Sequence, residues 1–492
     1  MSSAKSAESD LSPEAGGTQG RLGTGALTTW DCIAQSLAIG PIFSAAFVAF
    51  LIAGTAASAA PVAEIIGAVG VLALGYVISL YARRYQGAGA IYDYLRRTNP
   101  ILGIFGAGIY FLGALTLDSG GFLVLGLLVS QTLGQYLNLN IPWWLGTIIM
   151  LAIVFAINHF GIKLTTRVQL TLTSLSVIPL LILAVAIIVQ GGAAGNTLQA
   201  FNPGAVPASG LVGGILFAIL LFVGFETSAS LGEETANPQR SIPRAVIGTV
   251  ALAAVFFLLM IYACDIGYGL ANTSKWASDS LALDTMANRY VGKWLAVLID
   301  IAVFLDATAV MSAFMATTAR GFFAIARAGL LPRPLATVSK RHNTPLGGNL
   351  SVAIVALIIL VVTALSQLHV ADATAQGNVF TQFGIMSTIG SLLIELIYIV
   401  LAVVAIRFVR EAPIWWRWIV LAIAIVTPVL GIYGSVVPFP PFPNSLAVYV
   451  AVACVVVAGV WAFLMPSLRP AAVQKAREPY AWEGDTESTA LY

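Results

Sequence analysis

Residues 223–244 have the sequence VGFETSASLGEETANPQRSIPR and follow an unbroken apolar run over residues 215–222. This stretch places Gly224 and Glu226 inside a long apolar segment and then ends that segment with charged residues and two prolines. A helix in the core of a soluble protein has no need of such an interruption. In a membrane, a helix broken at mid-depth is tolerated only where it lines a cavity. The stretch therefore predicts a membrane-spanning segment that is interrupted beside an internal cavity.

The composition of the whole chain agrees with a membrane protein. Of its 492 residues, 59% are hydrophobic and only 9% are charged, whereas a soluble domain carries roughly 25% charged residues. We therefore expect a surface that faces membrane lipid. The net charge of +2 gives no reason to expect a nucleic-acid partner. The chain has three cysteines, Cys32, Cys264 and Cys454, which lie far apart in the sequence and have no histidine at ligand spacing. We therefore expect no disulfide framework and no metal site. We also expect no cofactor.

Apolar segments long enough to cross a bilayer recur along the chain. A spanning helix needs about 20 mostly apolar residues. Twelve segments qualify, at about 28–54, 59–82, 101–135, 143–161, 165–190, 209–234, 244–271, 292–324, 346–367, 378–406, 414–437 and 444–466. The sequence thus predicts an all-α membrane protein with one domain over residues 26–466. The polar stretches 1–25 and 467–492 are expected to be tails on the same side.

The basic residues set the orientation of these spans. Cytoplasmic segments of membrane proteins carry an excess of lysine and arginine. With both termini inside, 21 of the 24 basic residues fall on the cytoplasmic side, and only Lys275, Arg289 and Lys293 fall outside. We therefore expect a multi-pass protein of the cell membrane with both termini in the cytoplasm. The outer segment 272–291 is long enough to carry a short surface helix.

The first span is also interrupted, at Gly40-Pro41. Proline has no N–H group and its ring collides with the preceding helical turn, so it breaks the hydrogen-bond ladder. The two interruptions lie five spans apart, one in each half of the chain. A matched pair of broken helices is typical of transporters built from inverted repeats. Asp31, which follows Thr28, is expected to cap the start of this span.

Four blocks of sequence resemble the amino acid–polyamine–organocation family of permeases, over about residues 22–466. They are the run at 224–244, RRYQGAGAIY at 83–92, GIK at 161–163 with RVQ at 167–169, and AR at 319–320 with ARAGLLP at 326–332. The resemblance implies twelve helices, arranged as a five-plus-five inverted repeat with helices 1 and 6 broken, followed by two more. It also implies alternating access and no enzymatic activity.

The resemblance places the substrate between the two breaks. The implied substrate-binding residues are Ala38, Ile39, Gly40, Pro41, Ile42 and Phe43 in the first span, and Phe222, Gly224, Phe225 and Glu226 in the sixth. Backbone amides at the start of the second half-helix would attract a carboxylate, and carbonyls at the sixth-span break would accept an ammonium. Phe43, Phe222 and Phe225 would seal the site. For Glu226, a purely structural role that holds the broken helix is an equal alternative.

Two departures from the family weaken a standard amino acid site. Many amino acid permeases resembling this chain have Gly-Ser-Gly where it has Ile39-Gly40-Pro41, so one amide donor is lost and bulk is added. Proton-coupled relatives often have a lysine where this chain has Ser176. The co-transported ion, a proton or sodium, is therefore expected at other groups. The candidates for the coupling-ion site are Asp306, Thr308, Ser312 and Ser176.

Carboxylates inside the membrane give an argument that is independent of the family. Asp118, Glu226, Asp306 and Glu395 fall well inside predicted spans, and no basic residue lies at comparable depth. Such groups are costly and are usually functional. Asp118 is expected either to contact a cationic group or proton, or to make a hydrogen bond between helices. Glu395 is expected to be structural. Together they favour a cationic substrate or co-ion.

These observations predict a secondary transporter of amino acids or closely related small amines. A polyamine, alkanolamine or potassium carrier is the alternative, and a sensor that binds without flux is a third. A membrane enzyme is disfavoured, because the chain has no nucleophile–histidine pair, metal cluster or phosphate loop. Glu233 and Glu234, near Arg240 and Arg244, are expected to form a solvated helix end, with a gating network as the alternative.

Overall fold

The described part of the chain is helical throughout. The computed structural model describes residues 27–37, 40–160, 162–279, 281–339, 341–366, 375–411 and 414–475. Within these ranges the one extended pairing is an isolated bridge between Leu27 and Thr235. The α-helices are α1 (Thr29–Ser36), α2 (Pro41–Phe47), α3 (Ala49–Ala56), α4 (Ala60–Ala82), α5 (Ile91–Arg96), α6 (Pro100–Leu137), α7 (Trp143–Phe160), α8 (Ile162–Val189), α9 (Ala208–Leu220), α10 (Pro238–Tyr268), α11 (Thr273–Ser278), α12 (Ala282–Tyr290), α13 (Lys293–Arg327), α14 (Leu346–Leu365), α15 (Ala375–Glu411), α16 (Trp415–Val436), α17 (Ser445–Leu468) and α18 (Pro470–Lys475).

Ten helical stretches in the described residues are long and apolar enough to cross a membrane. The first of them, Ala49–Ala82, joins α3 to α4 through a single 3-10 turn. The predicted spans 28–54 and 209–234 do not appear as continuous helices, because both are interrupted where the sequence predicted breaks. The prediction of an all-helical, multi-pass membrane protein is confirmed.

The largest boundary error concerns α10. The span was expected from residue 244, but the helix begins at Pro238. Proline is well tolerated in the first turn of a helix because the N–H groups there have no intrahelical partner. Pro243 lies only slightly further in and removes one hydrogen bond. The proline-rich exit is therefore the first turn of the next helix.

Segment 272–291 contains two short helices, α11 and α12, where one was expected. The start of α1 agrees with the sequence. Thr28 and Asp31 form a reciprocal capping box, in which the Thr28 N–H donates to Asp31 Oδ2 at 2.8 Å.

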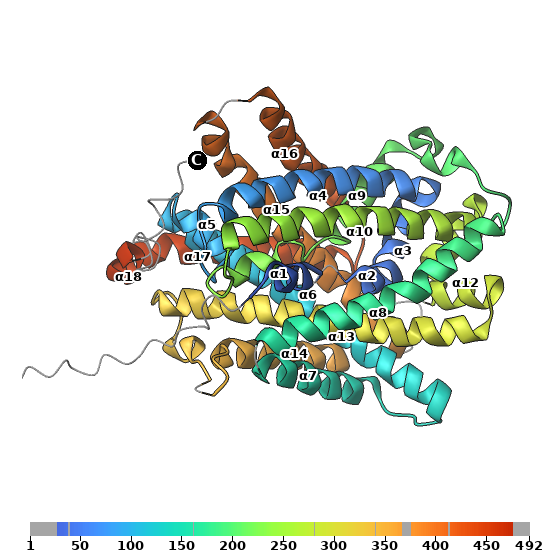
Figure 1. The fold of residues 1–492 in the computed structure, drawn as a ribbon, viewed down its shortest axis with the longest axis horizontal. Helices are drawn as coiled ribbons and strands as arrows, with labels where there is room; N and C mark the ends of the chain where they lie inside the picture. The colour runs from blue at the N-terminus through green and yellow to red at the C-terminus, as the bar shows by residue number, and fades with distance from the viewer. Residues whose placement is uncertain are drawn as a thin grey trace, which may run out of the picture.

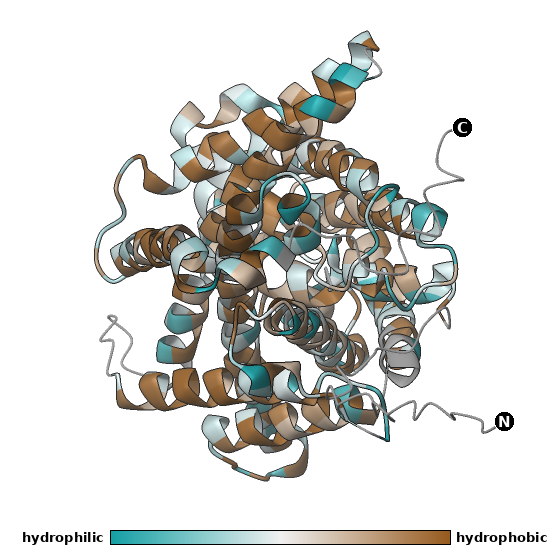
Figure 2. Ribbon diagram, turned by 90° about the vertical axis from the view of Figure 1, so that its left-hand side faces the viewer, coloured by the Kyte–Doolittle hydropathy of each residue, from teal (hydrophilic) through white to brown (hydrophobic). Residues whose placement is uncertain are grey.

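The long helices run side by side, and the two halves of the first span lie end to end among them (Figure 1). α1 packs on α10 and α8, and α2 packs on α13 and α8. α6 lies at the centre of the bundle, because 89% of the residues in its most apolar stretch are buried. In α17, at the periphery, the corresponding share is 22%. The helices consist mainly of hydrophobic residues (Figure 2), and many large apolar side chains are exposed, as expected for contact with lipid.

Glycine allows the closest approach between α6 and α13. A Cβ atom on Gly321 would lie 1.9 Å from Cζ of Phe111, so only glycine fits at this crossing. Small residues at helix–helix contacts are typical of membrane bundles, where packing rather than hydrophobic burial drives association. This close packing fixes α13 against the bundle core, and α13 is the helix that reaches the first break.

Candidate functional site

The first break is set by Gly40. α1 ends at Ser36, and α2 begins at Pro41 after Gly40, which has a positive φ of 56°. A Cβ atom on Gly40 would lie 2.1 Å from Cγ2 of Val310, so both the backbone conformation and the space require glycine. The two predicted site residues Ala38 and Ile39 lie outside the described residues.

The carboxylate of Asp306, on α13, holds the start of α2. Its Oδ2 accepts hydrogen bonds from the N–H groups of Ile42 at 3.0 Å and Phe43 at 2.9 Å. Its Oδ1 accepts the hydroxyl of Thr173, on α8, at 3.1 Å. The amides that were expected to receive a substrate carboxylate thus already bind a carboxylate of the protein itself.

The second break runs from Leu221 to Glu226, between α9 and a 3-10 turn at Thr227–Leu231. Gly224 has a positive φ of 114°. Its N–H group donates to Glu226 Oε2 at 3.1 Å, and the hydroxyl of Tyr110, on α6, donates to Glu226 Oε1 at 3.0 Å. Glu226 therefore stabilises the broken segment, which is the structural alternative considered for it.

Hydrogen bonds join the two breaks directly. The Ser36 hydroxyl donates to the carbonyl of Phe225 at 2.9 Å and to the hydroxyl of Ser228 at 2.8 Å. The Thr227 hydroxyl donates to the carbonyl of Gln35 at 2.6 Å. The end of α1 and the second break therefore form one hydrogen-bonded unit.

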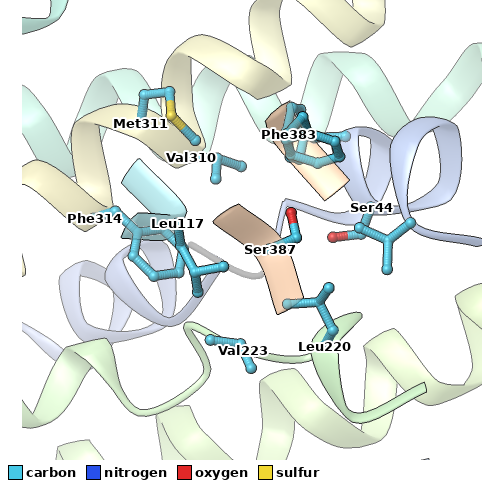
Figure 3. A pocket seen from close by; sticks show the side chains of 11 residues that line it. Ser44, Leu117, Leu220, Val223, Val310, Met311, Phe314, Phe383 and Ser387 are labelled. Carbon is cyan, nitrogen blue, oxygen red and sulfur yellow. The ribbon is translucent and has the colours of Figure 1, made fainter. Parts of the chain in front are cut away.

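A small cavity of about 40 Å³ lies beside this unit (Figure 3). It is lined by Phe43, Ser44, Val48, Leu117, Leu220, Val223, Val310, Met311, Phe314, Phe383 and Ser387. The lining comes from α2, α6, the end of α9 with the second break, α13 and α15, and it is apolar except for the two serine hydroxyls. Five helical segments that are distant in sequence therefore share one internal space.

Of the three predicted sealing rings, Phe43 lines the cavity, whereas Phe222 and Phe225 do not. Phe222 packs edge-on against Phe257, with ring centroids 5.2 Å apart, and Phe225 packs against Tyr398 at 5.7 Å. Leu220 and Val223 line the cavity in their place, because the turn at Gly224 directs the phenylalanines into the protein core.

The other candidates for the ion site are not gathered around Asp306. The Thr308 hydroxyl donates to the Phe304 carbonyl at 2.8 Å, and the Ser176 hydroxyl donates to the Leu172 carbonyl at 2.7 Å. The Ser312 hydroxyl accepts the side-chain amide of Asn158 at 3.1 Å. Each of the three therefore makes a hydrogen bond elsewhere.

Two further intramembrane carboxylates are fully buried. Neither Asp118 nor Glu395 accepts a hydrogen bond from the described residues. Glu395 packs against Gly431, where a Cβ atom would lie 2.6 Å from Oε2. Asp118 directly follows Leu117 of the cavity lining.

Buried ion pairs connect the exit of the second break to α13. Glu233 bonds to Arg327 at 2.6 Å and Glu234 to Arg320 at 2.8 Å, all four side chains being buried or nearly so. The expectation of a solvated helix end near Arg240 and Arg244 was therefore wrong. The turn of the chain after Gly232 directs both glutamates toward α13 instead.

Sequence inspection missed most of the cavity lining. Ser44, Phe314, Phe383 and Ser387 carry no motif, and hydroxyl or aromatic residues are common in membrane helices. Val310 could have been found, because it lies one helical turn after Asp306. Three hydrogen-bonding partners were also missed, namely Tyr110, Thr173 and Gln35.

The sequence of the chain is similar to those of known permeases and importers. Branched-chain amino acid permease BcaP of Bacillus subtilis is 26% identical over 213 residues, or 43% of each chain. Low-affinity putrescine importer PlaP of Escherichia coli K12 is 23% identical over 288 residues, or 56% of this chain and 62% of that protein. The matches thus span less than two thirds of either relative.

The fold resembles that of a solved transporter. The crystal structure of the Eremococcus coleocola manganese transporter, in complex with an aromatic bis-isothiourea substituted compound, aligns with a TM-score of 0.58. The alignment covers 91% of this chain and 95% of that one at 12% identity, so the likeness concerns the fold alone. A family model described as amino acid permease matches residues 27–463. This match covers most of the 492 residues and confirms the resemblance found in the motifs: the chain belongs to the amino acid permease family.

Proposed function

We propose that this chain is a secondary transporter that moves amino acids or closely related small amines across the cell membrane by alternating access. The observation that carries the proposal is the pair of hydrogen-bonded helix breaks beside an internal cavity. Broken helices at mid-membrane are how secondary transporters present backbone groups to a substrate. The names of BcaP and PlaP, a branched-chain amino acid permease and a putrescine importer, support this range of substrates.

The proposed architecture has twelve spans within residues 26–466. The second span would be α4, nine more would be the other continuous helical stretches, and the remaining two would be the interrupted segments α1–α3 and α9 with its following turn. The first ten spans would form the five-plus-five inverted repeat, with two more after it. Both termini would be cytoplasmic, as the distribution of basic residues favours.

The ion pairs of Glu233 and Glu234 with α13 are proposed as the inner gate. They lie at the end of the bundle where Leu27 pairs with Thr235, next to the N-terminal segment. Breaking a buried pair leaves uncompensated charge and costs several kcal/mol, so the gate would open only when water enters from that side. Rocking of the bundle around the cavity would supply this opening.

Coupling to a proton or sodium is proposed at Asp306, which joins α13, α8 and α2. A carboxylate that links three helices changes its partners when those helices move, so it is well placed to bind an ion in one state only. Asp306→Asn keeps the shape but removes the charge, and we expect exchange that no longer responds to pH or sodium. Unchanged ion dependence in this variant would reject the assignment.

The function is tested by counterflow in proteoliposomes. Vesicles are loaded with amino acids, amines or polyamines at pH 6 and 8, with and without sodium, and uptake of the labelled compound is followed. Saturable exchange above protein-free vesicles is expected for at least one compound. Saturable binding without exchange would instead identify a sensor and overturn the proposal.

A further inference from the structure

We infer that the substrate of this cavity is an amine with an apolar body and no free carboxylate, because the carboxylate of Asp306 already occupies the backbone amides of the first break. The inference rests on the proposed transport function and names its substrate class. It departs from a zwitterionic amino acid, whose carboxylate would need those same amides. The argument depends on where each hydrogen-bond donor near the cavity is used.

Asp306 uses both side-chain oxygens at the first break. Oδ2 is shared by the Ile42 and Phe43 amides, and Oδ1 is held by Thr173. Asp306 itself is fully buried. A second carboxylate brought to these amides would lie against the first without a cation between them, and two like charges in a buried site repel strongly.

The neighbouring backbone offers no replacement donor. Gly40 N–H donates to the Leu37 carbonyl at 3.0 Å, and Ser44 N–H donates to the Gly40 carbonyl at 2.7 Å. Pro41 has no N–H group. Every amide from Gly40 to Ser44 is therefore used within the protein.

The second break is rich in acceptors and poor in donors. The Gly224 amide is used by Glu226, and the amides of Phe222, Val223 and Phe225 are bonded within the turn. The carbonyls of Leu221 and Val223 receive no hydrogen bond from the described residues. Of these two residues, Val223 lines the cavity. An unpaired carbonyl beside a cavity suits a substrate that donates hydrogen bonds, such as an ammonium group.

Charge near the cavity also favours a cation. None of the lining residues is basic. The buried guanidinium of Arg320 is paired with Glu234, and that of Arg96 with Asp93. A substrate carboxylate would be buried without a counter-charge, which is costly.

The shape of the lining determines the rest of the substrate. Phe314 and Phe383 line the cavity, and the hydroxyls of Ser44 and Ser387 are its polar side chains (Figure 3). Phe43 also belongs to the lining. Aromatic faces attract ammonium groups and pack against hydrocarbon. A monoamine with a branched or aromatic body satisfies these surfaces, whereas a polyamine would bury a second ammonium among apolar side chains.

The test compares pairs of compounds that differ only in the carboxylate. Counterflow by the wild-type protein is measured with phenethylamine against phenylalanine and with 3-methylbutylamine against leucine, after subtraction of uptake by protein-free vesicles. Phenylalaninamide, which keeps the carbon skeleton without a negative charge, is the third probe. We expect both amines and the amide to exchange about tenfold or more faster than the two acids, as expected when a charged group would be left unpaired.

Equal exchange of phenylalanine and phenethylamine, or exchange of the acids alone, would overturn the inference while leaving the proposed transport function intact. Exchange of putrescine alone would also overturn it. If none of the amino acids, monoamines and polyamines exchanges, the transport proposal fails and the inference fails with it.

A variant links the exchange to this cavity. Phe383→Ala removes one ring of the lining, and we expect the half-saturating concentration of phenethylamine to rise about fivefold or more. Phe439→Ala is the matched control, because this ring is half-exposed and packs against Tyr449 away from the cavity. Equal effects of the two substitutions, or no effect of Phe383→Ala, would contradict the assignment to this cavity.

Discussion

The two helix breaks satisfy their backbone groups in different ways. At the first break, the amides of Ile42 and Phe43 bond to Asp306, which is more than 260 residues away in the sequence. At the second, the amide of Gly224 bonds to Glu226, two residues further along the same segment. The second break is thus largely a local structure, whereas the first exists only when α13 is in place. We expect the first to be the more sensitive to substitution and to helix movement.

Removal of Asp306 should have the largest effect. Asp306→Ala leaves two buried amides and the Thr173 hydroxyl without a partner, each at a cost of about 1–3 kcal/mol. We expect loss of exchange and a clear fall in the thermal unfolding temperature in detergent. Asp306→Asn keeps one oxygen that can accept from the Ile42 and Phe43 amides, and its NH2 group can donate to the Thr173 hydroxyl, so it should recover most of this stability. An alanine variant as stable as the wild type would show that the first break does not depend on α13.

Gly40→Ala should be the next most severe change. The new methyl group would overlap Val310 and the residue would keep a strained positive φ, at a combined cost of about 2–4 kcal/mol. Val310→Ala in the same chain should restore only part of the stability, because it relieves the overlap but not the strain. Complete rescue, measured by thermal unfolding, would mean that space alone requires glycine here.

Glu226→Gln should reduce exchange strongly but stability only by about 1 kcal/mol. Glutamine can accept a hydrogen bond from either Tyr110 or Gly224 with its one oxygen, so one of the two contacts is weakened. Tyr110→Phe serves as the companion variant, since it removes the other partner of the same carboxylate. Wild-type exchange by the glutamine variant would leave Glu226 with a purely structural role.

The smallest expected effect concerns Asp284 on α12, which lies outside both breaks. It serves as a reference for the variants at the breaks. Burial and the neighbouring carboxylate of Asp300 raise the pKa of Asp284, on α12, to about 7. The folded protein therefore holds this proton more tightly than the unfolded chain, so stability should fall as the pH rises from about 4 to about 7. Asp284→Asn should flatten this slope of unfolding temperature against pH.

Glu411→Gln is the control for this titration, because Glu411 is an exposed acid paired with Arg84 at another part of the molecule. Its slope should match that of the wild type. An unchanged slope of unfolding temperature against pH in Asp284→Asn would show that another group causes the pH dependence. The change in slope caused by Asp284→Asn should be the same whether or not either break is altered.

Much of the fold could be predicted from the sequence because lipid imposes a simple rule. Every backbone polar group in the bilayer core must be satisfied internally, so apolar runs of the right length become helices. The positions of both breaks followed from Gly40-Pro41 and Gly224 for the same reason, since these residues interrupt helical hydrogen bonding. The expected start of α10 was wrong because proline disrupts a helix interior but not its first turn.

The contents of the site were harder to predict. Glu226 was identified as an intramembrane charge within a stretch that resembles the family, and Asp306 was identified as an intramembrane charge. Its bond to the first break was not foreseen, because that contact joins residues far apart in sequence. The solvated helix end expected for Glu233 and Glu234 was wrong for the same reason, because their partners, Arg327 and Arg320, lie on another helix far along the chain.

The sequence by itself determined the membrane class, the apolar segments, the two interruptions and the excess of buried acidic groups, since each is a property of a continuous stretch of chain. The tertiary structure decided which group occupies the interruption in the first span and which side chains line the cavity. Those features depend on the rotation and depth at which α13, α6 and α15 pack against the breaks. Packing of this kind is set by close contacts between distant residues, such as Gly321 with Phe111, which leave no periodic pattern in the chain.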